Sequence, residues 1–222
     1  MALQEIADIC IFKTPCILSL SKLRSILYTY GPNIYINQYS SIGSTFLSDV
    51  LKARYVKESI ILSCVKELVN VYNANLLIGS KEESRGQQRK KKKKKNEKNS
   101  NNNNIDVLPP LVIASARGMS SIVKFILTKV EKEEQTSITN IRTLLQMKGT
   151  SRFRLLTNPK KSLSGTYTSL EFAQKMKEME LLHCSDDSSD NGSAGSTSSN
   201  MKSLDECIKI LLKYEKKYIY DE

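Results

Sequence analysis

The chain has 222 residues, a formal net charge of +11 and a 40% apolar fraction, which fits one ordinary domain. The charge does not by itself indicate a nucleic-acid binder, because ten Lys and Arg against three Glu in residues 81–98 account for +7 and leave +4 elsewhere. Five cysteines without a CxxC pair, no secretory signal pattern and no bilayer-spanning apolar run lead us to expect a cytoplasmic or nuclear protein without disulfides.

Four amphipathic helices are predicted along the chain, each with apolar residues at i, i+3 and i+4 on one face. In chain order their apolar stripes lie within 23–27, 65–69, 122–127 and 207–212. This spacing alone would also fit four unrelated helices. A further stretch with helical spacing lies at 138–147, and residues 2–7 are a candidate for a first short helix.

The segment before the third of these helices has the features of a second, shorter helix. Pro110 stands where the first turn of a helix has unsatisfied amide donors, so a proline is tolerated there. Leu111 and Ala114 share a face, and the small Ala side chain lets a neighbouring helix approach closely. Gly118 can adopt the left-handed conformation that ends a helix. Together these residues predict a helix–turn–helix unit.

Two further units of this form are predicted. In one, Thr168 and Glu171 have the S/T-x-x-E spacing of a capping box. We expect its second helix to begin after a Ser-rich segment, at another capping box formed by Ser203 and Glu206. The other unit opens at residues 43–47 and continues into the helix with the stripe at 65–69.

These units resemble the ankyrin repeat. The resemblance is strongest at the Pro-Leu-x-x-Ala sequence from Pro110, at Gly118 between the two helices, and at the Ile-Val-Lys sequence of 122–124. The triplets at 31–33 and 73–75 are similar to the Gly-Ala-Asp that closes such a repeat. The His of the family's Thr-Pro-Leu-His motif is replaced in the three units by Val112, Glu171 and Ser48.

The spacing of the units exceeds the period of about 33 residues that an ankyrin repeat has. Leu47 and Leu111 are 64 positions apart, and Leu111 and Leu170 are 59 apart. The surplus residues fall mainly at 79–104 and 131–162, which are places where the repeat has loops. Insertions at such places are compatible with a stack of repeats.

Two low-complexity segments are predicted to be disordered. Residues 79–104 are rich in Lys, Asn and Gln, and residues 184–200 are mostly Ser, Asp, Gly and Asn, so neither can bury enough apolar surface to offset the entropy of ordering. We therefore expect a single domain over 1–222. By resemblance it is an all-α, ankyrin-like helical repeat solenoid of about four helix pairs, interrupted by these two insertions.

The resemblance implies a non-catalytic protein–protein interaction scaffold, which contacts its partner through the first helices and the loops of a concave surface. The candidate protein-binding residues are Tyr35, Asn37, Tyr39 and Tyr167. Tyrosine supplies rigid, amphipathic contact area, although packing between repeats is an equally good interpretation of these tyrosines. We expect Tyr214, Tyr218 and Tyr220 to cover the last repeat.

The sequence predicts no catalytic, cofactor or metal site. Its one histidine, His183, is not part of a recognisable Cys–His arrangement. Four ligands at the spacing of a zinc finger do not occur, and the nine glycines form no phosphate-binding loop. We therefore expect no enzyme activity and no cofactor.

A run of basic residues is the sharpest local signal. It consists of Arg89, Lys90, Lys91, Lys92, Lys93, Lys94 and Lys95. It resembles a nuclear-import signal or a phosphate-binding arm, and a neutral low-complexity expansion is the alternative, since 101–104 is an Asn homopolymer. No aromatic residues interleave with the lysines, so base stacking is not expected. We expect a monomer with a protein partner and no membrane or nucleic acid; the alternative is a nuclear or nucleic-acid-associated protein acting through this Lys-rich loop.

Overall fold

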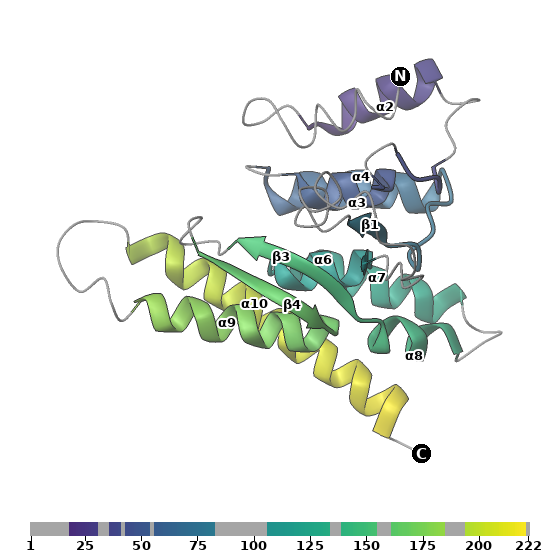
Figure 1. The fold of residues 1–222 in the computed structure, drawn as a ribbon. Helices are drawn as coiled ribbons and strands as arrows, with labels where there is room; N and C mark the ends of the chain where they lie inside the picture. Colours follow the sequence, from purple (N-terminus) through teal and green to yellow (C-terminus); the bar gives the residue numbers. More distant parts are fainter. Residues whose placement is uncertain are drawn as a thin grey trace, which may run out of the picture.

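The structure is a computed structural model, and it is mostly helical. It describes residues 18–30, 36–40, 43–53, 56–82, 106–133, 139–154, 161–184 and 194–220. The elements in chain order are α2 (Leu20–Tyr30), α3 (Phe46–Lys52), α4 (Glu58–Asn70), β1 (Ser80–Glu82), β2 (Asp106–Leu108), α6 (Pro110–Ala116), α7 (Ser120–Glu133), α8 (Thr139–Gln146), β3 (Gly149–Arg154), β4 (Ser162–Tyr167), α9 (Ser169–Cys184), α10 (Ala194–Glu215) and the π-helical turn η3 (Lys216–Tyr220) (Figure 1). The predicted helical class is confirmed, and two short antiparallel hairpins, β1–β2 and β3–β4, accompany the helices.

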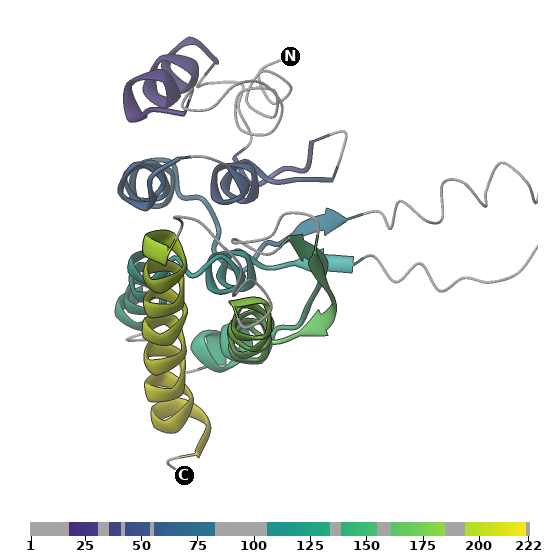
Figure 2. The same cartoon turned by 90° about the vertical axis from the view of Figure 1, so that its left-hand side faces the viewer.

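The helices are arranged in pairs. α3 packs against α4, α6 against α7 and α9 against α10, and consecutive pairs are in contact through both members. Figure 2 looks nearly along the axes of α3, α4, α6 and α9, with α10 inclined to them, and shows two layers, one with α2, α4, α7 and α10 and the other with α3, α6 and α9. We call these the outer and the inner layer. Each layer therefore gathers helices that are far apart in the sequence.

The turn between α6 and α7 shows why a glycine stands there. Gly118 has φ +66°. The Met119 N–H donates to the Ala114 carbonyl at 3.0 Å and the Gly118 N–H to the Ser115 carbonyl at 3.1 Å, which are the two bonds of a Schellman motif. An added Cβ at Gly118 would lie 3.4 Å from the Leu204 side chain of α10. The predicted left-handed turn is therefore confirmed.

Threonine side chains begin two helices of the inner layer. At α9 the Thr168 N–H donates to Glu171 Oε2 at 2.8 Å and the Glu171 N–H donates to Thr168 Oγ1 at 3.3 Å, so the predicted capping box is confirmed. At α3 the Thr45 hydroxyl accepts from the Ser48 N–H at 3.3 Å. The second predicted box, at Ser203, is wrong, because α10 begins at Ala194 and places this residue inside the helix.

Both segments that were predicted to be disordered contain regular structure at their edges. β1 lies inside the first segment and pairs with β2, which follows that segment, with Glu82 opposite Asp106. Residues 194–200 belong to α10, because a poor helix-forming sequence can continue a helix whose later turns pack against other elements. Residues 83–105 and 185–193 lie outside the described part of the chain.

Two further predicted helices have different outcomes. The helix predicted over 138–147 is confirmed as α8. The short helix predicted over 2–7 lies outside the described residues. For the first of the four expected helix pairs, α2 is thus the member that the structure describes, and α2 contacts α4 of the next pair.

The hydrophobic core extends between the two layers from α2 to α10. Its large, fully buried side chains include Leu27, Phe46, Leu68, Leu111 and Phe172. Ala114 is also fully buried in α6, which packs on both α3 and α9. The Arg117 guanidinium, after α6, donates to the Leu51 carbonyl of α3 and adds a polar link between consecutive pairs.

Candidate functional site

Two helices of the inner layer, α3 and α6, present few side chains to a partner. All residues of α6 and residues 46–51 of α3 are buried. The β3–β4 hairpin lies beside α6 and α9, on the side away from the outer layer (Figure 2). A Cβ added at Gly149 would be 2.9 Å from the Leu108 side chain, and the Phe153 ring meets the Phe172 ring edge-on at 5.2 Å. α3 and α6, the first helices of their pairs, therefore do not provide the exposed contact surface that the ankyrin resemblance implies.

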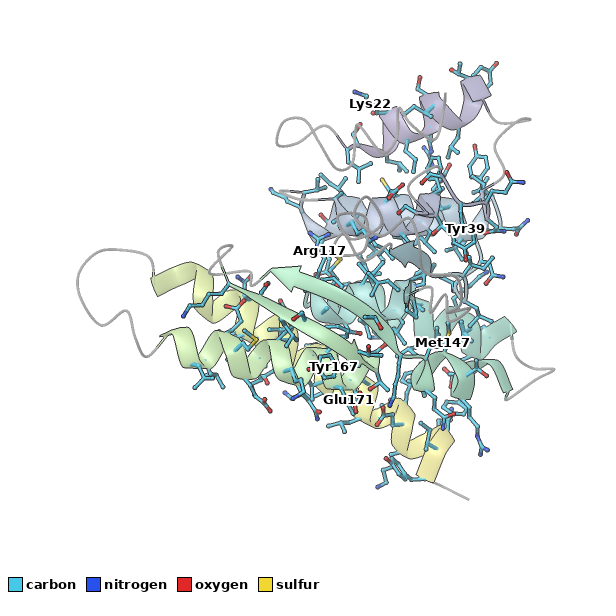
Figure 3. All side chains as sticks on the ribbon, in the orientation of Figure 1. Lys22, Tyr39, Arg117, Met147, Tyr167 and Glu171 are labelled. Carbon is cyan, nitrogen blue, oxygen red and sulfur yellow. The ribbon has the colours of Figure 1, made fainter. Side chains whose placement is uncertain are left out.

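Tyr167, one of the candidate binding residues, takes part in this covering contact. Its ring meets the Phe172 ring edge-on, with centroids 5.0 Å apart and planes at 85°. The Lys175 ammonium lies 5.4 Å from the centre of the Tyr167 ring. Figure 3 shows Tyr167 at the end of β4, next to the start of α9. The half-buried ring thus packs the hairpin onto α9, which is the packing interpretation of this tyrosine.

Asn37, the second candidate, joins two turns at the edge of the stack. Its Oδ1 accepts from the Asn75 N–H at 2.7 Å, and its Nδ2 donates to the Asn73 carbonyl at 3.2 Å. Asn73 has φ +55°, a conformation that asparagine tolerates better than most residues. The amide of Asn37 is therefore engaged on both sides, and it holds the turn at 36–40 against the turn that follows α4.

Tyr39 lies in the same turn and is 37% exposed (Figure 3). The backbone after it is closed by two hydrogen bonds, from the Ser40 N–H to the Ser44 carbonyl at 2.8 Å and from the Gly43 N–H to the Ser40 carbonyl at 2.9 Å. This ring is therefore presented by a loop that is anchored at both ends. Tyr35, the remaining candidate, lies outside the described residues.

A buried polar cluster lies where this loop meets α3. The Ser44 hydroxyl donates to the Asp49 carboxylate, and Lys52 Nζ donates to Ser80 Oγ at 2.9 Å, which ties β1 to the helix. Burial raises the pKa of Asp49, while the Ser44 hydrogen bond and the charge of Lys52 act in the opposite direction. The sequence analysis did not identify this cluster. A Ser-Asp pair within the apolar stretch 46–51 was the available signal.

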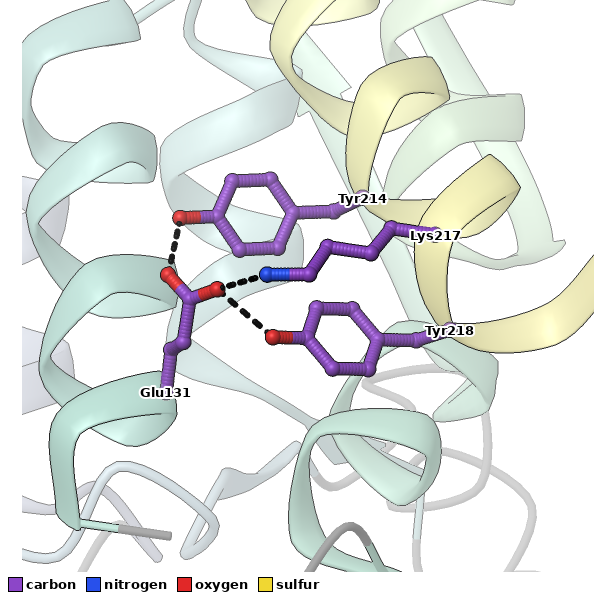
Figure 4. Close-up of polar contacts among 4 residues, drawn as sticks. All are labelled: Glu131, Tyr214, Lys217 and Tyr218. Carbon is purple, nitrogen blue, oxygen red and sulfur yellow. Dashed lines mark hydrogen bonds and ion pairs between the residues drawn. The ribbon is translucent and has the colours of Figure 1, made fainter. Parts of the chain in front are cut away.

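A second cluster, which the sequence analysis also missed, joins α7 to the end of α10 (Figure 4). The Glu131 carboxylate accepts from the Tyr214 hydroxyl at 2.9 Å, the Tyr218 hydroxyl at 2.6 Å and Lys217 Nζ at 2.6 Å. Hydrogen bonds from Lys217 and Tyr218 lower the pKa of Glu131 to about 2. Tyr214 and Tyr218 thus pack on α7, whereas Tyr220, expected to join them, is 73% exposed.

Carboxylates of the outer layer are used to join helices. Glu67 of α4 accepts two hydrogen bonds from the Arg24 guanidinium of α2. Glu58 at the start of α4 accepts from the Ser121 N–H of α7 at 2.8 Å, at a helix end that favours negative charge. Asp205 of α10 forms an ion pair with Lys177 of α9, with Oδ1 and Nζ 2.5 Å apart. These carboxylates therefore contact groups on other helices of the same chain.

Lysines remain exposed on the same layer. The exposed lysines are Lys22 on α2, Lys66 on α4, Lys124 and Lys132 on α7, Lys202, Lys209 and Lys213 on α10, and Lys216 and Lys217 on η3. Of these, Lys217 pairs with Glu131. The outer layer is consequently a basic surface, even without the run at 89–95, which lies outside the described residues.

Reactive groups are few in the described part of the chain. Cys64 and Cys207 are buried free thiols, and burial raises their pKa values to about 11 and about 12, so both stay protonated at neutral pH. His183 is in the last turn of α9, and its side chain is outside the described set. No group of three potential metal ligands occurs among the described residues. None of the described helices combines the length and apolar character needed to cross a membrane.

Comparison with known proteins adds no assignment to these features. No protein-family model matches the chain, and searches of curated proteins and of solved structures find no match either. The candidate surfaces are therefore the anchored turn that carries Tyr39 and the lysine-rich outer layer, both defined by the geometry of the chain itself.

Proposed function

We propose that the chain is a non-catalytic protein-interaction scaffold built as a divergent ankyrin-like stack of helix pairs. The observation that supports it most is the order of contacts: α3–α4, α6–α7 and α9–α10 each pack within the pair and onto the next pair. Architectures of this kind are stabilised mainly by contacts between neighbouring units, and they present long continuous surfaces. Protein recognition is what the ankyrin resemblance implies for such a surface.

The proposed contact surface differs from the one that the resemblance implies. Because α3 and α6 are buried and the β3–β4 hairpin covers the inner layer, the exposed outer layer and the turn at 36–40 are the better candidates. Tyr39 is the aromatic residue in that turn, and the hydrogen bonds of Ser40 and Gly43 hold the backbone that follows it. An aromatic side chain on a restrained backbone loses little conformational entropy on binding, which favours an interface role.

A second candidate function, nuclear or nucleic-acid association through the Lys-rich segment, is favoured by the β1–β2 stem. Glu82 and Asp106 face each other in this stem, so the chain enters and leaves residues 83–105 at one place. An insertion with adjacent ends can act separately from the stack that carries it. It can also be shortened without changing the path of the surrounding chain.

The stem allows a clean test of the two candidates. One variant replaces 83–105 by an Asn-Gly turn, which suits a two-residue hairpin, and a second carries Tyr39→Ala in the full chain. Cross-linking in cell lysate followed by mass spectrometry identifies the partners and the contact residues. We expect one set of partner proteins, cross-linked to the outer layer and the turn at 36–40, to be recovered with the full chain and the shortened one, and to be reduced by Tyr39→Ala.

One result of this experiment would reject the scaffold function. Recovery of nucleic acid or import receptors alone, and only with the full chain, would reject the scaffold and support the second candidate. Circular dichroism of both variants provides the control for folding.

A further inference from the structure

A line of exposed lysines runs along the last helix. Lys202, Lys209 and Lys213 of α10 are all exposed. An α-helix turns by about 100° per residue, so steps of seven and four residues return to within about 20° and 40° of the starting direction. Lys216 in η3 continues the line, which is about 21 Å long at 1.5 Å per residue. We call these four residues the basic stripe.

The carboxylates of α10 offset the positive charge of the basic stripe only in part, through Glu206, which lies four residues after Lys202 and three before Lys209. Asp205 binds Lys177 of α9, and Glu215 is half-buried, with a pKa that burial raises. Glu206 is the one exposed carboxylate in the described part of this helix. Like charges four apart, such as Lys209 and Lys213, repel each other and destabilise a helix. Acidic groups of a partner would remove this repulsion.

The helix dipole does not account for the whole basic stripe. Cations are favoured in the last turn of a helix, where carbonyl groups lack partners. This explains Lys213 and Lys216, at the end of α10 and in η3. Lys202 and Lys209 lie several residues before the end of α10, where the dipole contributes little. The helix dipole therefore leaves the positions of these two lysines unexplained.

The basic stripe continues onto neighbouring helices. The buried residues Ile122 and Ile126 in α7 correspond to the buried residues Cys207 and Leu211 in α10, which makes Lys124 the counterpart of Lys209. In α4 the buried residues Cys64 and Leu68 have the same spacing, so Lys66 is the corresponding lysine of that helix. These lysines are also exposed. The positive surface therefore extends over several outer helices, and it can attract a negatively charged partner from a distance.

Two exposed apolar side chains flank the basic stripe and indicate the class of partner. Leu212 is 47% exposed and Tyr220 is 73% exposed. Peptide side chains can pack against these groups, whereas a phosphate backbone cannot. α10 and η3 contain no arginine, the residue best suited to phosphate. These features favour an acidic protein segment over the phosphate backbone of a nucleic acid.

We propose that the basic stripe of α10 and η3 binds an acidic segment of a partner protein, with Leu212 and Tyr220 as its apolar contacts. The inference rests on the proposed scaffold function and names the chemistry of its partner. The acidic segment lies along α10, with carboxylates spaced to meet Lys202, Lys209 and Lys213. A helix with Glu at every third or fourth position has this spacing.

The test uses the full chain and a labelled synthetic helical peptide with Glu at every third or fourth position and two leucines. The stripe variant carries Lys209→Gln, Lys213→Gln and Lys216→Gln. The control variant carries Lys57→Gln, Lys148→Gln and Lys161→Gln, which are exposed lysines outside the helices of the outer layer, so that both variants lose the same charge. Fluorescence anisotropy measures peptide affinity, and melting curves confirm that both variants fold.

We expect the stripe variant to bind the peptide about tenfold more weakly than the wild type, and the control variant to stay within about twofold. Carbodiimide coupling of peptide carboxylates to lysine amines, located by mass spectrometry, should label the stripe. Leu212→Ser should weaken binding without changing its dependence on salt.

Several outcomes would overturn the inference. The first is an equal loss of peptide affinity in both variants. The second is carbodiimide coupling only at 90–95. The third is tighter binding of a short DNA duplex or of phosphatidylserine vesicles than of the peptide, if the stripe variant loses that binding as well. The two proposals remain distinguishable. If partners cross-linked in lysate bind the wild type and the stripe variant equally, the scaffold function stands and the stripe inference fails. If the wild type captures no protein, the scaffold function itself fails.

Discussion

Arg24 of α2 binds Glu67 of α4 through two parallel hydrogen bonds, from Nε to Oε1 at 2.9 Å and from an Nη to Oε2 at 3.0 Å. Glu67 is mostly covered, whereas Arg24 is largely exposed to solvent. The hydrogen bond from Arg24 lowers the pKa of Glu67. Two-point contact fixes the direction of approach of the two side chains as well as their distance. The pair thus helps set how α2 lies on α4.

Breaking this pair should have a small effect on stability. Arg24→Ala is expected to lower the melting temperature slightly, and the difference from wild type should shrink in high salt, because exposed ion pairs are screened. Arg24→Lys should recover only part of the loss, since lysine cannot form both bonds. Thermal melts at low and high salt measure this. A difference that is independent of salt would mean that packing, not charge, holds α2 in place.

The Glu131 cluster predicts a pH dependence. Glu131 has a folded pKa of about 2 against an ordinary 4.5, so its stabilising effect is complete above the unfolded value and is lost as the pH falls from about 4.5 towards 2. Because the carboxylate is partly in solvent, we expect a contribution on the order of 2 kcal/mol. Urea unfolding of wild type and Glu131→Gln should show a difference at pH 7 that disappears near pH 2. A constant difference would contradict the assignment.

The αL turn at Gly118 predicts a graded response to substitution. Gly118→Ala should cost about 1–2 kcal/mol, because an L-residue is strained at positive φ and the new Cβ would touch Leu204. Gly118→Asn should cost less, since asparagine tolerates this conformation. Chemical unfolding of both variants measures the order. The reverse order would show that contact with Leu204, and not φ, limits this site.

Ala114 tests the packing of the inner layer. Ala114→Glu places a charge in a fully buried position of α6, between α3 and α9, and should destabilise the protein by on the order of 4 kcal/mol. Far-UV circular dichroism during urea unfolding measures the loss. Lys124→Glu on the exposed face of α7 is the matched control and should change stability little. An unchanged midpoint for Ala114→Glu would refute the burial of this helix.

Local signals in the sequence predicted the helical units well. The glycine at 118 and the Thr168–Glu171 spacing act over a few residues, so their hydrogen bonds could be expected from the sequence and are found in the structure. The apolar stripe at 122–127 also corresponds to the buried face of α7. Cys207 and Leu211 of the stripe at 207–212 are buried in α10, whereas Leu212 is 47% exposed. Such features depend on residues that are close together in the chain, so they can be predicted from one sequence.

Features that depend on distant residues were not predicted. The position of the β3–β4 hairpin against α6 decides which surface is exposed, but Gly149 and Leu108 meet only in the folded chain. The start of α10 at Ala194 similarly depends on packing of its later turns. The partners of Asn37 are 36 and 38 positions away, so its bridging role could not be distinguished from a contact role by sequence alone.

The bridge made by Asn37 and the Arg24–Glu67 pair restrain the same step of the stack at two separate places. One attachment would act as a pivot, whereas two attachments allow rotation only about the line that joins them. Torsional stiffness at this step keeps α2 and the turn at 36–40 aligned with α4. A partner that touches several outer helices then meets side chains at a fixed spacing, and little of its binding free energy is used to straighten the protein.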